Sequence, residues 1–225
     1  MNMIGGLFQG VGTGEALSLN GQFADDATVA TSGGGADVAD TIMTFDPTTQ
    51  GYDKIYYFYN EDGAAAEEAN KWIDTDTDAP TDDIVAEGTG GWYRNRSNSS
   101  IQITMAGEVP TDPVYQVTLS PGMNFVANPY PAPIAMNGTT FTVNGVVAGG
   151  GADVADTIMT FNPTTQGYDK IYYFYNEDGA AAEEANKWID TDTDAPTTEV
   201  IAAGSGFWYR YRGTGTATIT FTKPY

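Results

Sequence analysis

The chain has 225 residues, of which 41% are hydrophobic and 12% aromatic, so it can bury one large core or two ordinary ones. Its 9 Lys and Arg residues against 30 Asp and Glu give a formal net charge of −21, which repels nucleic-acid backbones and anionic lipid. It contains no Cys and no His, which excludes thiolate nucleophiles, disulfides, Ser-His-Asp triads and Cys/His zinc sites. We predict a non-enzymatic protein with no nucleic-acid partner. We also predict no membrane insertion, since no apolar run approaches the roughly 20 residues of a bilayer span.

An internal repeat dominates the sequence. Residues 33–81 match residues 149–197 at a shift of 116 positions, and the single difference is Asp46 against Asn162. Self-similarity of this kind is the signature of duplicated structural units. We therefore expect the two segments to fold alike.

The repeat sets the expected domain boundaries. Residues 107–113 contain two prolines and no hydrophobic periodicity, which is typical of a linker. We predict one β module over residues 1–110 and a second copy over residues 111–225.

The predicted elements of the repeated segment are a buried strand and a short turn. Residues 55–59 and their copy at 171–175 are apolar or aromatic at every position, as in a strand covered on both faces. Residues 63–71 are rich in Ala and Glu, which favour helix, but the run is too short to be stable alone. We expect at most one or two helical turns there, within a loop.

The later predicted elements are strands. Apolar and polar residues alternate over residues 101–105, 115–119 and 217–222. Asn144 and Gly145 follow a short strand and predict a hairpin with residues 146–147, because this dipeptide favours a type I′ turn. Many short strands separated by 27 Gly and 11 Pro predict an all-β protein. Each module is expected to be a small antiparallel β-sandwich or barrel.

The first module is expected to lack its first strand. Residues 1–4 match residues 123–126, and in the second copy this motif follows the predicted strand at 115–119. Three interpretations stay open: further residues precede this segment, the first module has no such strand, or another chain supplies it. The last one predicts an open apolar edge beside Met3, Ile4 and Leu7, which is a template for strand addition.

Two motifs carry a resemblance to known modules. Residues 122–131 contain Asn-Pro-Tyr-Pro after an apolar strand, and residues 204–210 read Gly-Ser-Gly-Phe-Trp-Tyr-Arg. This combination resembles tandem β modules of secreted or surface-anchored proteins of environmental bacteria. The first copy departs from the pattern, because Gly5 and Gly6 stand where Asn-Pro-Tyr-Pro is expected. The resemblance implies an extracellular or cell-surface location and a structural, filament-forming or adhesive role.

Repeated acidic loops are candidates for calcium binding. Each loop places three carboxylates at alternate positions, and hard oxygen ligands in that number suit Ca²⁺. The candidate ligands are Asp74, Asp76, Asp78, Asp190, Asp192 and Asp194. The EF-hand pattern fails, because Ala79 replaces the required Gly and Val85 replaces the bidentate Glu. A solvated loop that binds no ion is the alternative.

An aromatic and cationic face recurs in both copies. Its residues share strand parity, and they are Trp92, Arg94, Arg96, Trp208, Arg210 and Arg212. We expect a structural role, in which each Arg pairs with a nearby Asp or stacks on the indole. The alternative is a surface platform on which a sugar ring stacks.

Three Asn residues match the sequence requirement for N-glycosylation, Asn95, Asn98 and Asn137. Taken together, the sequence predicts an extracellular structural protein whose subunits join into a filament or surface lattice by pairing strand edges with copies of the same chain. The alternative is a cell-surface module that binds carbohydrate or a partner through loops shaped by Ca²⁺.

Overall fold

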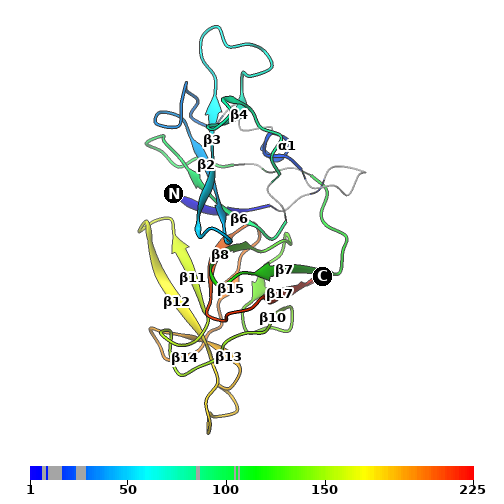
Figure 1. Cartoon of the computed structure of the whole chain (residues 1–225), viewed down its shortest axis with the longest axis vertical. Coiled ribbons are helices and arrows are strands. Elements are labelled where there is room, and N and C mark those ends of the chain that lie inside the picture. The colour runs from blue at the N-terminus through cyan, green and yellow to red at the C-terminus, as the bar shows by residue number, and fades with distance from the viewer. Residues whose placement is uncertain (7–8, 10–16, 24–28, 85–86, 104, 106) are drawn as a thin grey trace.

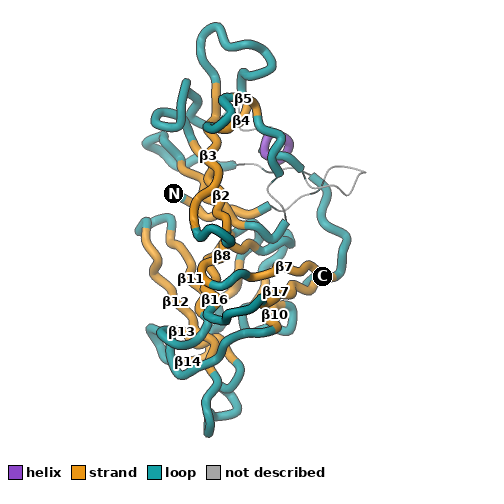
Figure 2. The backbone as a smooth tube through the Cα atoms, viewed as in Figure 1, coloured by secondary structure: helices purple, strands orange, loops and turns teal. Residues whose placement is uncertain are grey.

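The computed structural model describes residues 1–6, 9, 17–23, 29–84, 87–103, 105 and 107–225. This part of the chain contains seventeen strands and a single four-residue helix, α1 (Leu19–Gln22) (Figures 1 and 2). The prediction of an all-β protein is confirmed. No helix among the described residues is long and apolar enough to cross a membrane.

Two six-stranded antiparallel sheets form the body of the protein, one in each half of the chain. In the first half the spatial order is β1 (Asn2–Gly5), β6 (Gly90–Arg94), β2 (Thr41–Asp46), β3 (Gly51–Tyr59), β4 (Lys71–Asp74) and β5 (Ala79–Pro80). In the second half it is β8 (Gly122–Ala127), β16 (Gly206–Tyr211), β11 (Thr157–Asn162), β12 (Gly167–Tyr175), β13 (Lys187–Asp190) and β14 (Ala195–Pro196). The two sheets therefore have the same order, strand for strand.

The register of the edge strands extends this equivalence to residues 1–5. Asn2 lies opposite Tyr93 in the first sheet, and Asn124 lies opposite Tyr209 in the second. Equivalent edge residues are thus 124 − 2 = 122 positions apart, six more than the 116 of the repeat. The six extra residues of the first half must lie between its edge strand and residue 33.

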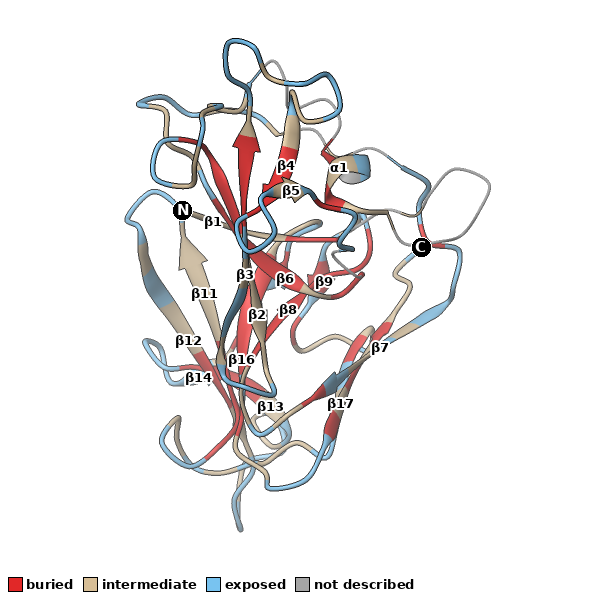
Figure 3. Ribbon diagram, turned by 45° about the horizontal axis from the view of Figure 1, so that its top comes forward, coloured by how far each residue is buried: buried red, intermediate tan, exposed pale blue. Residues whose placement is uncertain are grey.

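The second half is a complete β-sandwich. A three-stranded sheet in the order β10 (Phe141–Asn144), β17 (Ala217–Thr222) and β7 (Val114–Leu119) covers one face of its six-stranded sheet (Figure 3). Ile219 and Phe221 of β17 are fully buried and share a core with Trp188 and Tyr209. A small two-stranded sheet, β9 (Ile134–Ala135) with β15 (Val200–Ile201), lies at the margin.

The first half has an equivalent core under a different cover. Its six-stranded sheet buries Tyr56, Trp72 and Tyr93, and α1 contributes Leu19. Ile101, Ile103 and Met105 pack against this core and are partly buried. The described part of residues 1–110 contains no second sheet, so the strand predicted at 101–105 is wrong at the described positions. Its counterpart β17 is held by a ladder on each side, whereas residues 101–103 have no strand partner in the described chain.

One of two further local predictions differs from the structure. β10 pairs with β17 rather than with residues 146–147, because the backbone of Val147 bonds Asp156 instead. The segment 63–71 forms a turn within a loop, as predicted, in which the N–H groups of Glu68 and Ala69 both donate to the Ala65 carbonyl. Asn70, with a φ of 58°, ends this turn just before β4.

Candidate functional site

An apolar cluster joins the two halves of the chain, and we call it the module boundary. Trp92, Phe125 and Trp208 are 4%, 5% and 5% exposed at its centre. The partly buried residues around them are Met1, Met3, Met43, Phe45, Met123, Met159 and Phe161. Strands β1, β6, β8 and β16 meet in this region, at the middle of the long axis (Figure 1). The cluster is built from equivalent positions of the two sheets.

The ring contacts across the module boundary are reciprocal. Phe45 of the first half stands edge-on to Trp208 at 4.7 Å, and Phe161 of the second half stands edge-on to Trp92 at 4.8 Å. Aromatic pairs favour this edge-to-face geometry, because the positive ring edge meets the negative face. Each indole N–H also donates to a tyrosine hydroxyl of its own half, at 3.0 Å and 2.8 Å.

Two equivalent glutamines make reciprocal hydrogen bonds across the module boundary. The side chain of Gln50 accepts from the backbone N–H of Met123 at 2.7 Å and donates to its carbonyl at 2.9 Å. Gln166 makes the same two contacts with Met1, at 2.7 Å and 3.2 Å. Both glutamines have a left-handed backbone, with φ of 57° and 55°. Each half therefore binds the backbone of the other half at the start of its edge strand, through Met1 before β1 and Met123 in β8.

Backbone hydrogen bonds complete the pattern. The Gly5 N–H donates to the Gly204 carbonyl at 3.2 Å, and the Ala127 N–H donates to the Gly88 carbonyl at 2.8 Å. Gly88 and Gly204 are equivalent positions with φ of 71° and 68°. The ring contacts, the glutamine hydrogen bonds and the backbone hydrogen bonds are thus all related by one approximate two-fold axis. The isologous contact of a symmetric dimer has the same property.

The tryptophans of the predicted aromatic and cationic face lie in this boundary, with partners other than the expected ones. Arg94 and Arg210 are exposed, while the guanidinium groups of Arg96 and Arg212 donate to the carbonyls of Ala36 and Ala152. Among the described residues, the ion pairs are made by Lys54 and Lys170 instead of these arginines. The expected stacking of Arg on indole is therefore replaced by ring contacts between the halves.

Sequence reasoning missed a buried aspartate in each half. Asp156 is completely buried and accepts from the Tyr209 hydroxyl at 2.8 Å and from the Arg212 N–H at 2.7 Å. Asp40 makes the equivalent contacts with Tyr93 and Arg96, at 2.9 Å and 2.6 Å. Burial raises the pKa of Asp156, because it penalises the charged carboxylate. The available signal was an acid directly before a strand with a buried apolar face.

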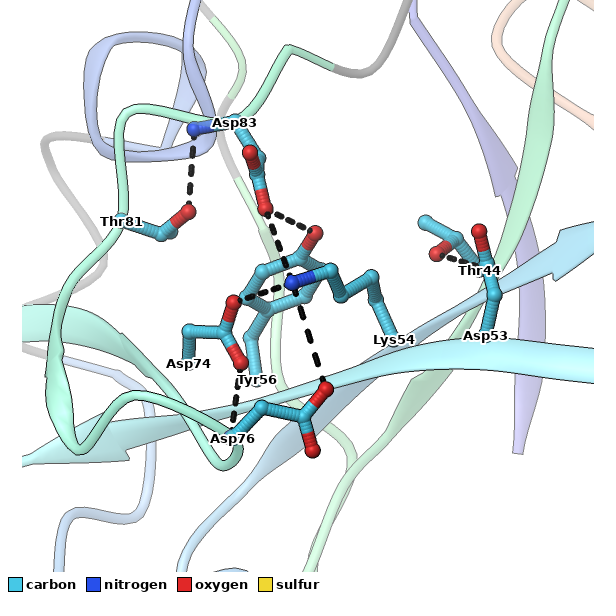
Figure 4. Close-up of polar contacts among 8 residues, drawn as sticks. All are labelled: Thr44, Asp53, Lys54, Tyr56, Asp74, Asp76, Thr81 and Asp83. Carbon is cyan, nitrogen blue, oxygen red and sulfur yellow. Dashed lines mark hydrogen bonds and ion pairs between the residues drawn. The ribbon is translucent and has the colours of Figure 1, made fainter.

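The acidic loops use their carboxylates within the protein (Figure 4). Asp74 is 4% exposed and accepts from the Lys54 ammonium at 2.7 Å and from the Asp76 N–H at 2.8 Å. Asp78 accepts from the Tyr57 hydroxyl at 3.0 Å, and burial together with this bond raises the pKa of Tyr57 to about 12. Asp190 and Asp194 repeat these contacts with Lys170 and Tyr173.

This geometry gives the calcium interpretation no support. Within each loop the first and third carboxylates bond to different side chains, and Asp76 contacts Lys54 at 4.0 Å. No group of three or more acidic side chains in the described part of the chain is placed to hold a metal ion. The hydrogen bond to Asp74 raises the pKa of Lys54 and so favours its charged form. The Lys54 ammonium therefore already places a positive charge beside the Asp74 carboxylate.

The three candidate glycosylation sites differ in their surroundings. Asn98 is exposed, and the Asn95 amide donates to the Ser99 carbonyl at 2.8 Å. The Asn137 amide donates to the carbonyls of Trp188 and Thr197, each at 2.9 Å, and its oxygen accepts from the Trp188 N–H. A glycan on this nitrogen would replace one of its two hydrogens and so remove one of the donated bonds. The geometry therefore assigns Asn137 to holding strand β13.

A cavity lies beside residues 101–103, and we call it the strand groove. It has a volume of about 720 Å³, and its lining includes Asn2, Asn95, Ser99, Ile101, Ile103 and Gln166. In the second half the positions equivalent to Asn95, Ile101 and Ile103 are buried, and β7 pairs with this part of β17. Among the described residues of the first half, no strand pairs beside residues 101–103 as β7 pairs with β17.

Comparison with known proteins finds no family model, no curated protein and no solved structure that this chain matches. The resemblance to secreted β modules thus rests on residues 122–131 and 204–210. The function has to be argued from the module boundary and the strand groove.

Proposed function

We propose that this chain is a non-enzymatic, extracellular structural subunit that joins neighbouring subunits by accepting a β-strand in the strand groove. The observation that carries the proposal is that no described strand of the first half pairs with residues 101–103 as β7 pairs with β17. The sandwich of the second half closes with β7, and the described first half has an open groove at the equivalent place.

The chemistry of the groove suits an extended, alternating strand. In the second half Leu119 lies opposite Ala217 and Val117 lies opposite Ile219. Ile101 and Ile103 occupy the positions equivalent to Ala217 and Ile219, and both remain partly exposed. An incoming strand would supply ladder hydrogen bonds to their backbone and cover their side chains, which is the basis of strand addition.

The proposed acceptor differs in place from the edge predicted at Met3, Ile4 and Leu7. Met3 lies in the module boundary and Ile4 lies in β1, which pairs with β6, and both are partly buried, as Ile101 and Ile103 are. Leu7 lies outside the described residues. The counterpart of β7 belongs beside residues 101–105 in the second layer, because β7 pairs with β17 and not with β8.

The partner we propose is a neighbouring copy of this chain, whose β7 would leave its own β17 to enter the groove. Each subunit that gives one strand and accepts one makes a heterologous contact, which grows an open fibre unless the rotation closes a ring. A carbohydrate platform at Trp92 and Trp208 has less support, because both indoles are covered by the opposite half.

The test is to fill the groove from within the chain. A copy of residues 114–122 fused ahead of Met1 reaches residues 101–105 by the route that β7 takes to β17. We expect the fused chain to stay monomeric by light scattering and electron microscopy, while the parent chain forms polymers. The control fusion carries Asp in place of the residue copied from Val117, and it should polymerise like the parent. Polymers of equal length from all three chains would contradict the proposal.

A further inference from the structure

The two halves of the module boundary are nearly alike, and they differ where the approximate two-fold axis passes. Gly5 and Ala127 are equivalent edge-strand residues, opposite Gly90 and Gly206 respectively, and they face each other across the axis. Both are buried. A Cβ placed on Gly5 would overlap the Cβ of Ala127, far inside van der Waals contact.

The neighbouring pair shows the same kind of asymmetry. Met3 and Phe125 are equivalent, opposite Trp92 and Trp208. Phe125 stacks on Trp208 at 4.5 Å and lies 5.6 Å from Trp92, so a single phenyl ring serves both indoles. A Cβ on Gly90 or on Gly206 would run into this same ring. The axis therefore has room for one Phe beside one Met.

We propose that Gly5 and Met3 are specificity determinants, which make the first half the partner of the second half and prevent two second halves from pairing. A pair of second halves would bring Ala127 against Ala127 and Phe125 against Phe125, and the close-packed axis cannot accept either contact. A pair of first halves would leave two second halves without partners. A first half paired with a second half is thus the arrangement in which every half has a partner and the axis residues do not clash.

This selectivity concerns the boundary and is independent of the strand groove. Outside the axis, the reciprocal contacts of Phe45, Phe161, Gln50 and Gln166 would be equally good between like halves. The small residue at position 5 is what distinguishes the pairs. If two chains exchanged halves, the first half of one chain would pair with the second half of the other.

A size exchange in the full chain tests the contact. We expect Gly5→Ala to lower the melting temperature, although Gly to Ala in a strand is normally stabilising. Adding Ala127→Gly should restore most of the loss, because the methyl group then sits on the opposite side of the axis. A Gly5→Ala variant as stable as the parent, or a double variant no better than Gly5→Ala, would overturn the assignment.

A second measurement tests the choice of partner. A protease site placed in residues 107–113 allows the folded full chain to be cleaved and its paired halves to be weighed by native mass spectrometry. We expect unlike pairs from the parent sequence. The variant Phe125→Met with Ala127→Gly gives the second half the axis residues of the first, and pairs of second halves should then appear. Such pairs in the parent, or their absence from the variant, would contradict the proposal.

Discussion

The ring of Phe45 stands edge-on to the indole of Trp208 across the module boundary, with their centroids 4.7 Å apart. Its equivalent, Phe161, does the same to Trp92. A residue of each half thus completes the burial of the other half's tryptophan. The stability of either half should consequently depend on the other.

The first prediction concerns these tryptophans. Replacing Trp208 with Ala should lower the free energy of unfolding by about 3 to 5 kcal/mol, the usual scale for a large buried aromatic side chain. Trp92→Ala should cost a similar amount, because its surroundings are equivalent. Urea denaturation measures both values. The control Tyr225→Ala removes an exposed ring and should cost far less. A loss confined to one tryptophan would refute the reciprocal boundary.

The second prediction concerns a side chain that binds backbone in each half. Asn137 bonds Trp188 and Thr197, and Asn20 makes the same contacts with Trp72 and Thr81. Changing either Asn to Ala leaves these backbone groups unpaired and should cost about 1 to 3 kcal/mol. Asn98→Ala, at an exposed position, should be neutral. Thermal unfolding compares the three variants, and equal melting temperatures would show that the bridging bonds contribute nothing.

Peptide mapping of native material provides a further check on Asn137. We expect this residue to be unmodified, because its amide nitrogen donates two hydrogen bonds. A glycan found at Asn137 would require a different local structure.

The third prediction concerns acid. Burial is the largest single influence on Asp74 and raises its pKa. The hydrogen bond and charge of Lys54, together with the backbone N–H groups of Asp76 and Thr77, outweigh burial and hold the pKa of Asp74 below its ordinary value of 3.8. A carboxyl with a lowered pKa contributes stability that is complete above that ordinary value and is lost as pH falls through the lowered one. The pKa of Asp190 is lowered in the same way. Both contributions should therefore disappear in strong acid.

Melting temperatures of the parent and of the double variant Asp74→Asn with Asp190→Asn test this. The variant should be less stable at neutral pH, and its disadvantage should shrink between about pH 5 and about pH 2. Asp62→Asn, on an exposed turn, should follow the parent throughout. A disadvantage that is constant over this range would show that ionisation of the pair does not matter.

The fourth prediction concerns calcium. Because Asp74 and Asp78 bond side chains of the protein, we expect the melting temperature to be the same in Ca²⁺ and in EDTA. Asp76→Ala together with Asp192→Ala should have equal effects in both buffers. A loss seen in Ca²⁺ but not in EDTA would restore the loops as ion sites.

Local patterns in the sequence predicted some of the strands that ladders hold in the structure. Alternation identified β7 and β17, and continuous apolar character identified β3. The same alternation did not produce a strand at the described residues 101–103 and 105, because ladder partners come from distant segments and local pattern cannot supply them. The hairpin predicted from Asn144 and Gly145 is wrong for a related reason. The backbone N–H of Val147 bonds the buried Asp156, and a turn pattern does not reveal a partner so far along the chain.

The candidate site was less predictable than the fold. Strand parity placed Trp92 and Trp208 on one face but could not say what covers that face. Their cover is the equivalent face of the other half, including Phe45 and Phe161. The reciprocity depends on the placement of one whole sheet against the other, which is a three-dimensional property. The repeat in the sequence was the available signal that the halves could pair.

The most direct measurement is the titration of the full chain with a synthetic peptide of residues 114–122, followed by calorimetry and light scattering. Strand addition in the groove predicts saturable binding of one peptide per chain and loss of polymers. The variant Ile103→Asp, which places a charge in the groove lining, should bind the peptide at least tenfold more weakly, and Val143→Asp, on the three-stranded sheet of the second half, serves as its matched control. Absence of binding to the parent chain, or equal binding by the parent and Ile103→Asp, would contradict the account.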